Sequence, residues 1–208
     1  MIIGLKANVD EIAKTYLTAY PNAKILYAGA KDYAGQEREK FFNRMKNNEW
    51  DCVIMSHDQF GRIPQSQKIE LEVLQEDMEK LAQSLDALRS ESSWSISSQM
   101  RKGLERRKRN LEAKRLSLLN DMRKRKDDVV DFQMMAVDHI LVDESHQFKN
   151  LGFSTRHDRV AGLGNSEGSK RAFNLLMAIR TIQKRTGRDL GATFLSGTTV
   201  TNSLTELY

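Results

Sequence analysis

The segment that most constrains the fold of this chain is residues 140–150, ILVDESHQFKN, where an apolar run leads straight into acidic and polar residues. The run 140–142 predicts a buried strand, and Asp143 and Glu144 follow it immediately. Open α/β sheets carry their chemistry at the carboxyl ends of their strands. Adjacent carboxylates at such an end suit work on nucleotides, because one can hold a Mg²⁺ that bridges phosphates while the other orients an attacking water. A strand-end turn with solvated acids is the plainer alternative.

Short apolar runs alternate with amphipathic stretches through much of the chain. Helical patterns lie at 9–17, 36–48 and 169–185, and strand patterns lie at 24–28, 52–55, 138–142 and 192–195. The run 52–55 is apolar throughout, which is typical of parallel strands that are covered on both faces. Strands that alternate with helices predict an α/β fold with a mostly parallel sheet flanked by helices.

Residues 66–126 differ in character from the rest. Their first half carries apolar residues at alternating spacings of three and four, at Leu71, Leu74, Met78, Leu81, Leu85 and Leu88. A polar break at 90–98 separates this seam from a second one, in which Leu104, Leu111 and Leu118 lie seven apart. Two helices of similar length joined by a polar break predict an antiparallel coiled-coil hairpin inserted into the α/β body.

The predicted domain organisation follows from this insertion: residues 1–65 begin the α/β lobe, residues 66–126 form the hairpin, and residues 127–208 complete the lobe. The net charge of +5 is concentrated in the insertion. Residues 67–91 carry seven acids and three bases, a net of −4, and residues 101–126 carry twelve bases and three acids, a net of +9. These two segments account for the whole net charge.

Arg106 and Arg107 belong to the densest basic run and are candidates for nucleic-acid binding, because each phosphate contact adds a salt-dependent contribution to affinity. The alternative is a solvated coiled-coil face that pairs with the acidic arm. The hairpin is also a candidate docking site for a protein partner.

The composition excludes several classes of protein. A single cysteine, Cys52, rules out an intramolecular disulfide and fits a reducing compartment. The four histidines lack a zinc-site spacing, and no apolar stretch approaches the roughly 20 residues of a membrane span. We therefore expect a soluble, cytoplasmic protein with no membrane association and no metal site made by protein ligands alone.

Several segments resemble motifs of one enzyme family. Residues 143–146, DESH, look like a DEAH-type box, and residues 194–202, FLSGTTVTN, are similar to a Thr/Ser-Gly-Thr-Pro-x-x-Asn motif. Residues 53–60, VIMSHDQF, resemble a strand followed by Thr/Ser-His-x-x-Phe, and residues 24–29 match the strand after the first nucleic-acid-contacting helix. In this order, the motifs resemble the first RecA-like motor lobe of superfamily-two helicases and translocases of the Swi/Snf-related type.

Two further short matches, one dipeptide and one tetrapeptide, point to a subgroup of this family. Lys149-Asn150 follows the acidic motif, and residues 205–208, TELY, follow the hydroxyl-rich motif. Both are similar to large helicase-like proteins of phages and mobile elements, which are often joined to an adenine-N6 DNA methyltransferase. The resemblance covers most of the chain, with the hairpin as its least diagnostic part.

The resemblance implies a role for each matching position. Asp143 would bind Mg²⁺ through water, Glu144 would position the attacking water, and His146 would complete the catalytic set. The coupling turn to which His146 connects would be Ser196, Gly197 and Thr198. The residues implied in nucleic-acid contact are Lys6, Gly29, Ser56 and His57. For Ser56 and His57 the alternative is that they only terminate a strand, and for His146 it is a simple helix cap.

The sequence departs from the family pattern in two places. The family's Gly-Thr-Pro is replaced by Gly197-Thr198-Thr199, so the rigid turn proline is missing. A phosphate-binding loop of the form G-x-x-x-x-G-K-[ST] is also absent from the sequence. The stretch 162–170, GLGNSEGSK, has the wrong spacing and follows the carboxylates instead of preceding them, so we interpret it as a loop before a helix.

We therefore expect a piece of the first motor lobe of an ATP-dependent DNA helicase or translocase, lacking the phosphate loop and the second lobe. Its parent would use ATP and Mg²⁺ on double-stranded DNA, whereas the piece alone would hold neither and would be inactive. A natural, degenerate remnant is the alternative origin. The alternative function is a non-catalytic module that binds nucleic acid or protein through the hairpin.

Overall fold

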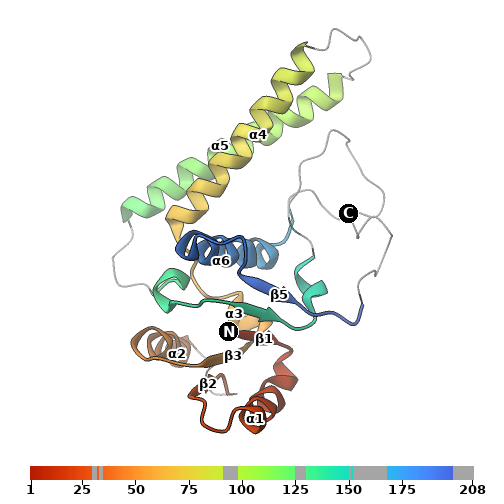
Figure 1. Ribbon diagram of the computed structural model, residues 1–208. Helices are drawn as coiled ribbons and strands as arrows, with labels where there is room; N and C mark the ends of the chain where they lie inside the picture. Colours follow the sequence, from red (N-terminus) through yellow and green to blue (C-terminus); the bar gives the residue numbers. More distant parts are fainter. Residues whose placement is uncertain are drawn as a thin grey trace.

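The computed structural model describes residues 1–29, 32, 35–90, 98–124, 130–149, 151 and 168–198. These residues form an α/β body from which a long helical hairpin projects (Figure 1). The five strands are β1 (Ile2–Gly4), β2 (Ile25–Tyr27), β3 (Cys52–Ser56), β4 (Ile140–Val142) and β5 (Ala192–Phe194). They make one sheet in the order β2-β3-β1-β4-β5, and every pairing is parallel. The predicted fold class is confirmed.

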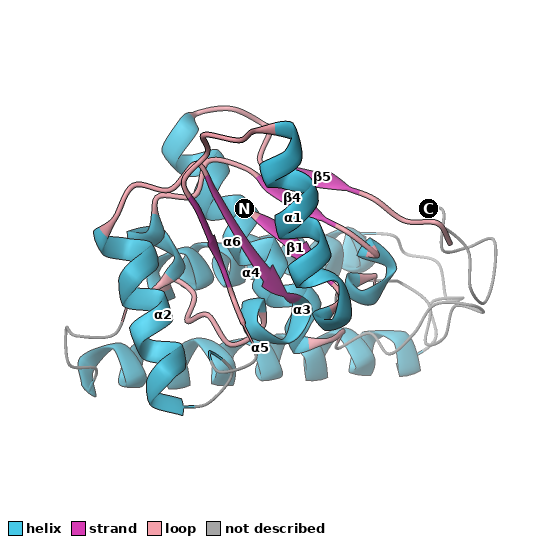
Figure 2. Ribbon diagram, turned by 90° about the horizontal axis from the view of Figure 1, so that it is seen from below, coloured by secondary structure: helices cyan, strands magenta, loops and turns pink. Residues whose placement is uncertain are grey.

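Helices cover both faces of the sheet. They are α1 (Val9–Ala19), α2 (Gly35–Asn47), α3 (His57–Phe60), α4 (Gln67–Ser90), α5 (Ser98–Lys124) and α6 (Lys170–Thr186). Short 3-10 turns lie at Lys6–Asn8, Phe132–Met135 and Ser145–Phe148. Helix α1 lies on one face, and α2 and α6 contribute side chains to the core on the other (Figure 2).

The position of strand β3 explains the continuous apolar run at 52–55. All its residues are buried, because successive side chains of a strand point to opposite faces and both faces here are covered. Cys52 and Ile54 pack with Val9 and Ala13 of α1. Met55, on the other face, joins the main core with residues of α2 and α6.

The inserted hairpin is built as its apolar spacing predicted. Helices α4 and α5 run antiparallel (Figure 1), and Leu81 and Leu85 of one pack against Leu104 and Leu111 of the other. Both helices fall within the predicted insertion 66–126. The division of the chain into three domains stays a prediction, and residues 91–97 of the predicted polar break lie outside the described residues.

The base of the hairpin is attached to helix α6. Ile69 and Val73 of α4 form a buried cluster with Met177, which has 0% of its surface exposed. Lys184 of α6 makes an ion pair with Glu72 of α4. Apolar packing attaches the start of α4 to the body. The ion pair contributes less to the stability of this attachment, because it is exposed.

One strand of the sheet was not predicted. Strand β1 spans Ile2–Gly4 and lies between β3 and β4 at the centre of the sheet. Gly4 interrupts the apolar run directly after Ile3, and glycine is depleted in strands, so the sequence did not favour a strand here. Within the described ranges, no helix is both long enough and apolar enough to cross a lipid bilayer.

Candidate active site

The two carboxylates predicted at a strand end lie there. Asp143 and Glu144 follow β4 directly, at the carboxyl edge of the sheet. The Asp143 amide donates to the Ile3 carbonyl oxygen of β1 at 2.8 Å, and the Ser145 amide donates to the Leu195 carbonyl oxygen at the end of β5 at 2.9 Å. In a regular strand, amides two residues apart face the same neighbour. Here the Asp143 amide faces β1 and the Ser145 amide faces the β5 side, so the backbone turns over at Glu144.

Glu144 makes this reversal by adopting a left-handed conformation, with φ of 50° and ψ of 50°. Residues other than glycine rarely adopt these backbone angles, and the conformation costs them on the order of 1–2 kcal/mol. The hydrogen bonds on either side of Glu144 hold the conformation in place. Backbone strain of this kind collects at functional sites, and here it falls on an acidic residue.

His146 joins the acidic turn to the hydroxyl-rich turn after β5. Its Nδ1 atom lies 3.1 Å from Oε2 of Glu144 and 3.4 Å from Oγ of Ser196. The Ser196 hydroxyl donates to the Thr198 carbonyl oxygen at 2.9 Å. A lone pair of Ser196 is therefore free to accept from His146, whose Nδ1–H is shared between the carboxylate and the hydroxyl. The two motifs lie 50 residues apart in the sequence.

Gly197 completes this second turn and is exposed, and a Cβ atom placed on it would meet nothing within 4 Å. The turn 196–198 is therefore open to a ligand or to another segment of protein. Thr199, which replaces the expected proline, lies outside the described residues.

Ser56 and His57 are buried, with exposed fractions of 1% and 5%. Ser56 caps α3: its Oγ accepts the Gln59 amide at 3.3 Å, while Gln59 Oε1 accepts the Ser56 amide at 3.4 Å. Both side chains are buried where the strand ends and α3 begins. Their contact with a nucleic-acid backbone stays a prediction.

His57 instead supports the acidic turn. Its Nε2 atom lies 2.8 Å from the carbonyl oxygen of Asp143, and its ring packs edge-on against Phe148 at 5.3 Å between centroids. Burial lowers the pKa of His57 below its ordinary value, with the nearby Arg171 cation acting in the same direction. The neutral ring therefore donates its Nε2–H to Asp143.

The other predicted nucleic-acid contacts fall into two places. Lys6 and Gly29 follow β1 and β2, so they share the carboxyl edge with the acidic turn. Lys6 is exposed, and the Gly29 amide donates to Oδ2 of Asp32 at 2.9 Å. Arg106 and Arg107 lie on α5 of the hairpin, not in the strand-end segments that form this edge.

Sequence reasoning missed Arg171, at the start of α6. Its guanidinium makes an ion pair with Asp58 of α3 at 2.8 Å and reaches Oε1 of Gln147, beside His146, at 3.5 Å. Arg171 therefore lies between the helix that follows β3 and the turn that follows β4. An arginine in the first turn of a helix is too common a pattern to have been selected from the sequence.

The structure also shows what the site offers a metal ion. In the described part of the chain, no three His, Cys, Asp or Glu side chains converge as metal ligands. The Asp143 carboxylate is half-buried, and no described residue makes an ion pair or a hydrogen bond with its oxygens. Such a carboxylate suits a hard cation whose other ligands are water and phosphate oxygens, which is the usual way proteins hold Mg²⁺.

The stretch 162–170 is described only from Gly168 onward. Ser169 is the N-cap of α6, and its Oγ accepts the Ala172 amide at 3.1 Å. This agrees with the interpretation of a loop before a helix. Residues 162–167 lie outside the described residues.

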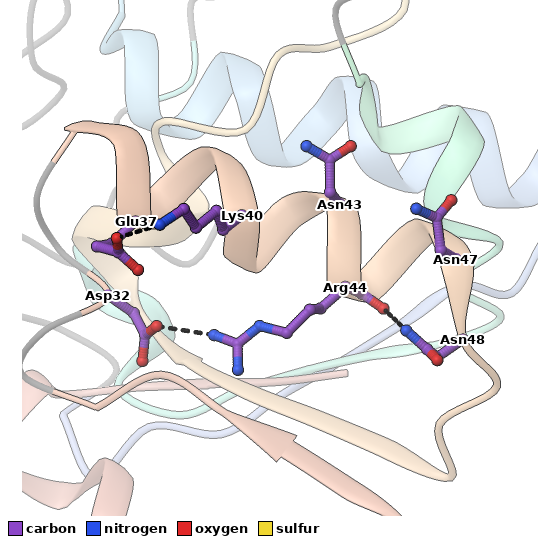
Figure 3. Close-up of a pocket in the computed structure, with 7 residues that line it drawn as sticks. All are labelled: Asp32, Glu37, Lys40, Asn43, Arg44, Asn47 and Asn48. Atoms are coloured by element: carbon purple, nitrogen blue, oxygen red, sulfur yellow. Dashed lines mark hydrogen bonds and ion pairs between the residues drawn. The ribbon is translucent and has the colours of Figure 1, made fainter.

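A separate polar hollow lies along helix α2 (Figure 3). Its lining includes an ion pair of 2.8 Å between Arg44 and Asp32 and one of 2.6 Å between Lys40 and Glu37. It contains none of the candidate residues, and its charged groups already pair with one another. The carboxyl edge around Asp143 and His146 therefore remains the candidate site.

A family model described as "Probable helicase domain" matches residues 1–208, the whole of the chain. No curated protein and no solved structure gives a match. Because the match covers the full length of the chain, this protein belongs to the probable helicase domain family.

Proposed function

We propose that this domain is the nucleotide-hydrolysing lobe of an ATP-dependent DNA helicase or translocase of superfamily two, of the Swi/Snf-related type. The observation that carries the proposal is the position of His146 between Glu144 and Ser196. It joins the carboxylate proposed to act on water to the hydroxyl-rich turn after β5. A chain that only presented a hairpin would not require this contact.

The proposed chemistry divides between the two acids. Asp143 would hold a Mg²⁺ through water, and the bound ion would neutralise phosphate charge. Glu144 would orient the attacking water, since His146 and the strained backbone fix the direction of its carboxylate. His57 would keep the Asp143 backbone in place from the opposite side.

Coupling to DNA would use the contacts around these acids. A change at Glu144 reaches Ser196 and Thr198 through His146. On the other side, the Asp143 backbone connects through His57 to α3. We propose duplex DNA as the partner at the carboxyl edge, where the exposed Lys6 lies.

The printed sequence contains no phosphate-binding loop of the form G-x-x-x-x-G-K-[ST]. Strand β5 is the edge of the sheet beside the candidate site, and Phe194 and Leu195 are 55% and 49% exposed there. We propose that a further strand of the parent protein pairs with β5 and carries the loop. The 208-residue chain alone would then bind ATP weakly and hydrolyse none.

A double-mutant cycle in the parent protein tests the proposal through His146. We expect His146→Ala and Ser196→Ala each to reduce DNA-stimulated ATP hydrolysis, and the double variant to lose little more than His146→Ala alone. His139→Ala is the matched control, because His139 also contacts a hydroxyl, Thr193 Oγ1 at 2.9 Å, but it precedes β4 and so lies at the amino end of that strand. Independent, additive effects of the two substitutions would contradict the coupling.

A further inference from the structure

The outward face of helix α5 carries a row of basic side chains. Lys102, Arg106 and Arg109 are all exposed and follow one another at spacings of four and three. At about 100° per residue, this spacing places them on one face of the helix. That face is opposite the one on which Leu104 and Leu111 pack against α4.

The acidic arm does not neutralise this row. Among the described side chains, no ion pair is formed by Lys102, Arg106 or Arg109. Lys108, on a neighbouring face of α5, lies 4.0 Å from Glu112 of its own helix. Glu72 of α4 is turned toward α6, where it meets Lys184. The positive charge of the outward face therefore stays available to an external anion.

Contacts of α5 with α4 and α6 fix the orientation of the basic row relative to the sheet. Lys114 of α5 lies 3.6 Å from Glu70 of α4, and its Nζ lies 3.9 Å from the centre of the Phe173 ring of α6. With the apolar cluster around Met177, these contacts fix both arms of the hairpin to the body. A polymer bound along α5 would therefore have a fixed orientation to the candidate site.

We propose that Lys102, Arg106 and Arg109 bind the phosphate backbone of duplex DNA. The row extends over about 10 Å, the length of two or three phosphates along one strand. Protein interfaces centre on apolar side chains, whereas the large exposed apolar side chain described on this face, Leu116, lies two turns beyond the row. The choice of DNA as the anion rests on the proposed function.

The test compares charge-neutral variants in binding to a labelled DNA duplex of about 30 base pairs, followed by anisotropy from about 50 to about 200 mM salt. The 208-residue chain is used without nucleotide. The variant with Lys102→Gln, Arg106→Gln and Arg109→Gln should weaken binding at least about tenfold. It should also reduce the slope of log affinity against log salt by about two to three.

A second triple variant with Lys14→Gln, Lys46→Gln and Arg188→Gln removes the same charge from exposed sites elsewhere, and it should bind within about twofold of the unchanged chain. Equal loss in the two triple variants would overturn the inference, since only net charge would then matter. Unchanged affinity and slope in the first variant would also overturn it, as would an equal loss caused by Leu116→Ser.

The binding test separates this inference from the proposed function. Duplex binding by the 208-residue chain is measured without nucleotide, so it does not depend on the hydrolysis assigned to Glu144, which lies at the carboxyl edge of the sheet and not on the hairpin. If the parent protein hydrolyses ATP normally with Glu144→Gln while the basic row binds DNA, the proposed function fails and the inference stands.

Discussion

The Nε2 atom of His57 lies 2.8 Å from the carbonyl oxygen of Asp143, although the two residues are 86 positions apart in the sequence. The contact connects the end of β3 to the end of β4 across β1, which lies between them in the sheet. It places a neutral, buried donor behind the acidic turn. The position of Asp143 is therefore determined by a neighbouring strand end as well as by its own strand.

Replacing His57 by phenylalanine should show how much this bond contributes. His57→Phe keeps an aromatic ring against Phe148 but leaves the Asp143 carbonyl without its donor, so we expect a loss of about 1–3 kcal/mol in the free energy of unfolding. Urea unfolding measures it. His139→Phe is the control, because His139 makes its contact in a more exposed place, and it should cost less than about 0.5 kcal/mol.

The backbone conformation of Glu144 makes a prediction of opposite sign for two substitutions. Glu144→Asn should preserve or raise the melting temperature, since asparagine tolerates the left-handed region. Glu144→Val should destabilise the chain by about 1–2 kcal/mol, because a β-branched side chain is strained at positive φ. Equal melting temperatures for the two variants would show that φ at this position is not positive in solution.

The spacing of apolar residues in the sequence predicted most of the strands and helices. The run 52–55 and the heptad leucines of 66–126 are long enough for their spacing to separate a buried strand from a coiled-coil helix. Gly187 ends α6 as its C-cap with a φ of 64°, a left-handed conformation that glycine favours. Asn8, at the N-cap of α1, belongs to a 3-10 turn and makes no side-chain cap hydrogen bond.

The candidate site was predicted less completely than the fold. Spacing in the sequence placed Asp143 and His146 near Ser196, since parallel strands bring their carboxyl ends to one edge. It could not show that His57 turns inward, because that direction depends on how β3 and β4 are placed around β1. Nor could it show the left-handed backbone of Glu144, which results from hydrogen bonds to two different strands.

The hairpin seam offers a pair of leucines on one helix for a stability test. Leu104 is 6% exposed and packs against α4, whereas Leu116 is 61% exposed on the same helix. Leu104→Ala should lower the free energy of unfolding by about 2–4 kcal/mol, because it removes buried methyl groups and leaves a cavity. Leu116→Ala should change it by less than about 0.5 kcal/mol. Urea unfolding followed by helical circular dichroism compares them, and equal losses would contradict the packing of the arms.

Cys52, the single cysteine, reports on the integrity of β3. Burial raises the pKa of its thiol, so the unfolded chain ionises first as pH rises. The stability contribution of the protonated thiol is therefore present below pH 9.0, the ordinary thiol pKa, and is lost as pH increases above it. Melting curves should show a steeper loss of stability above this pH than those of Cys52→Ala. A thiol reagent at pH 8 should react about 100-fold faster in urea than with the folded chain.

The claim that the acidic turn hydrolyses a nucleotide is tested most directly by Glu144→Gln in the parent protein. The measurement is DNA-stimulated ATP turnover, with Glu11→Gln on the exposed face of α1 as the matched control. The account predicts that turnover falls at least about 100-fold in Glu144→Gln, with DNA affinity within about twofold of the unchanged protein. Turnover at the unchanged rate in Glu144→Gln would contradict it.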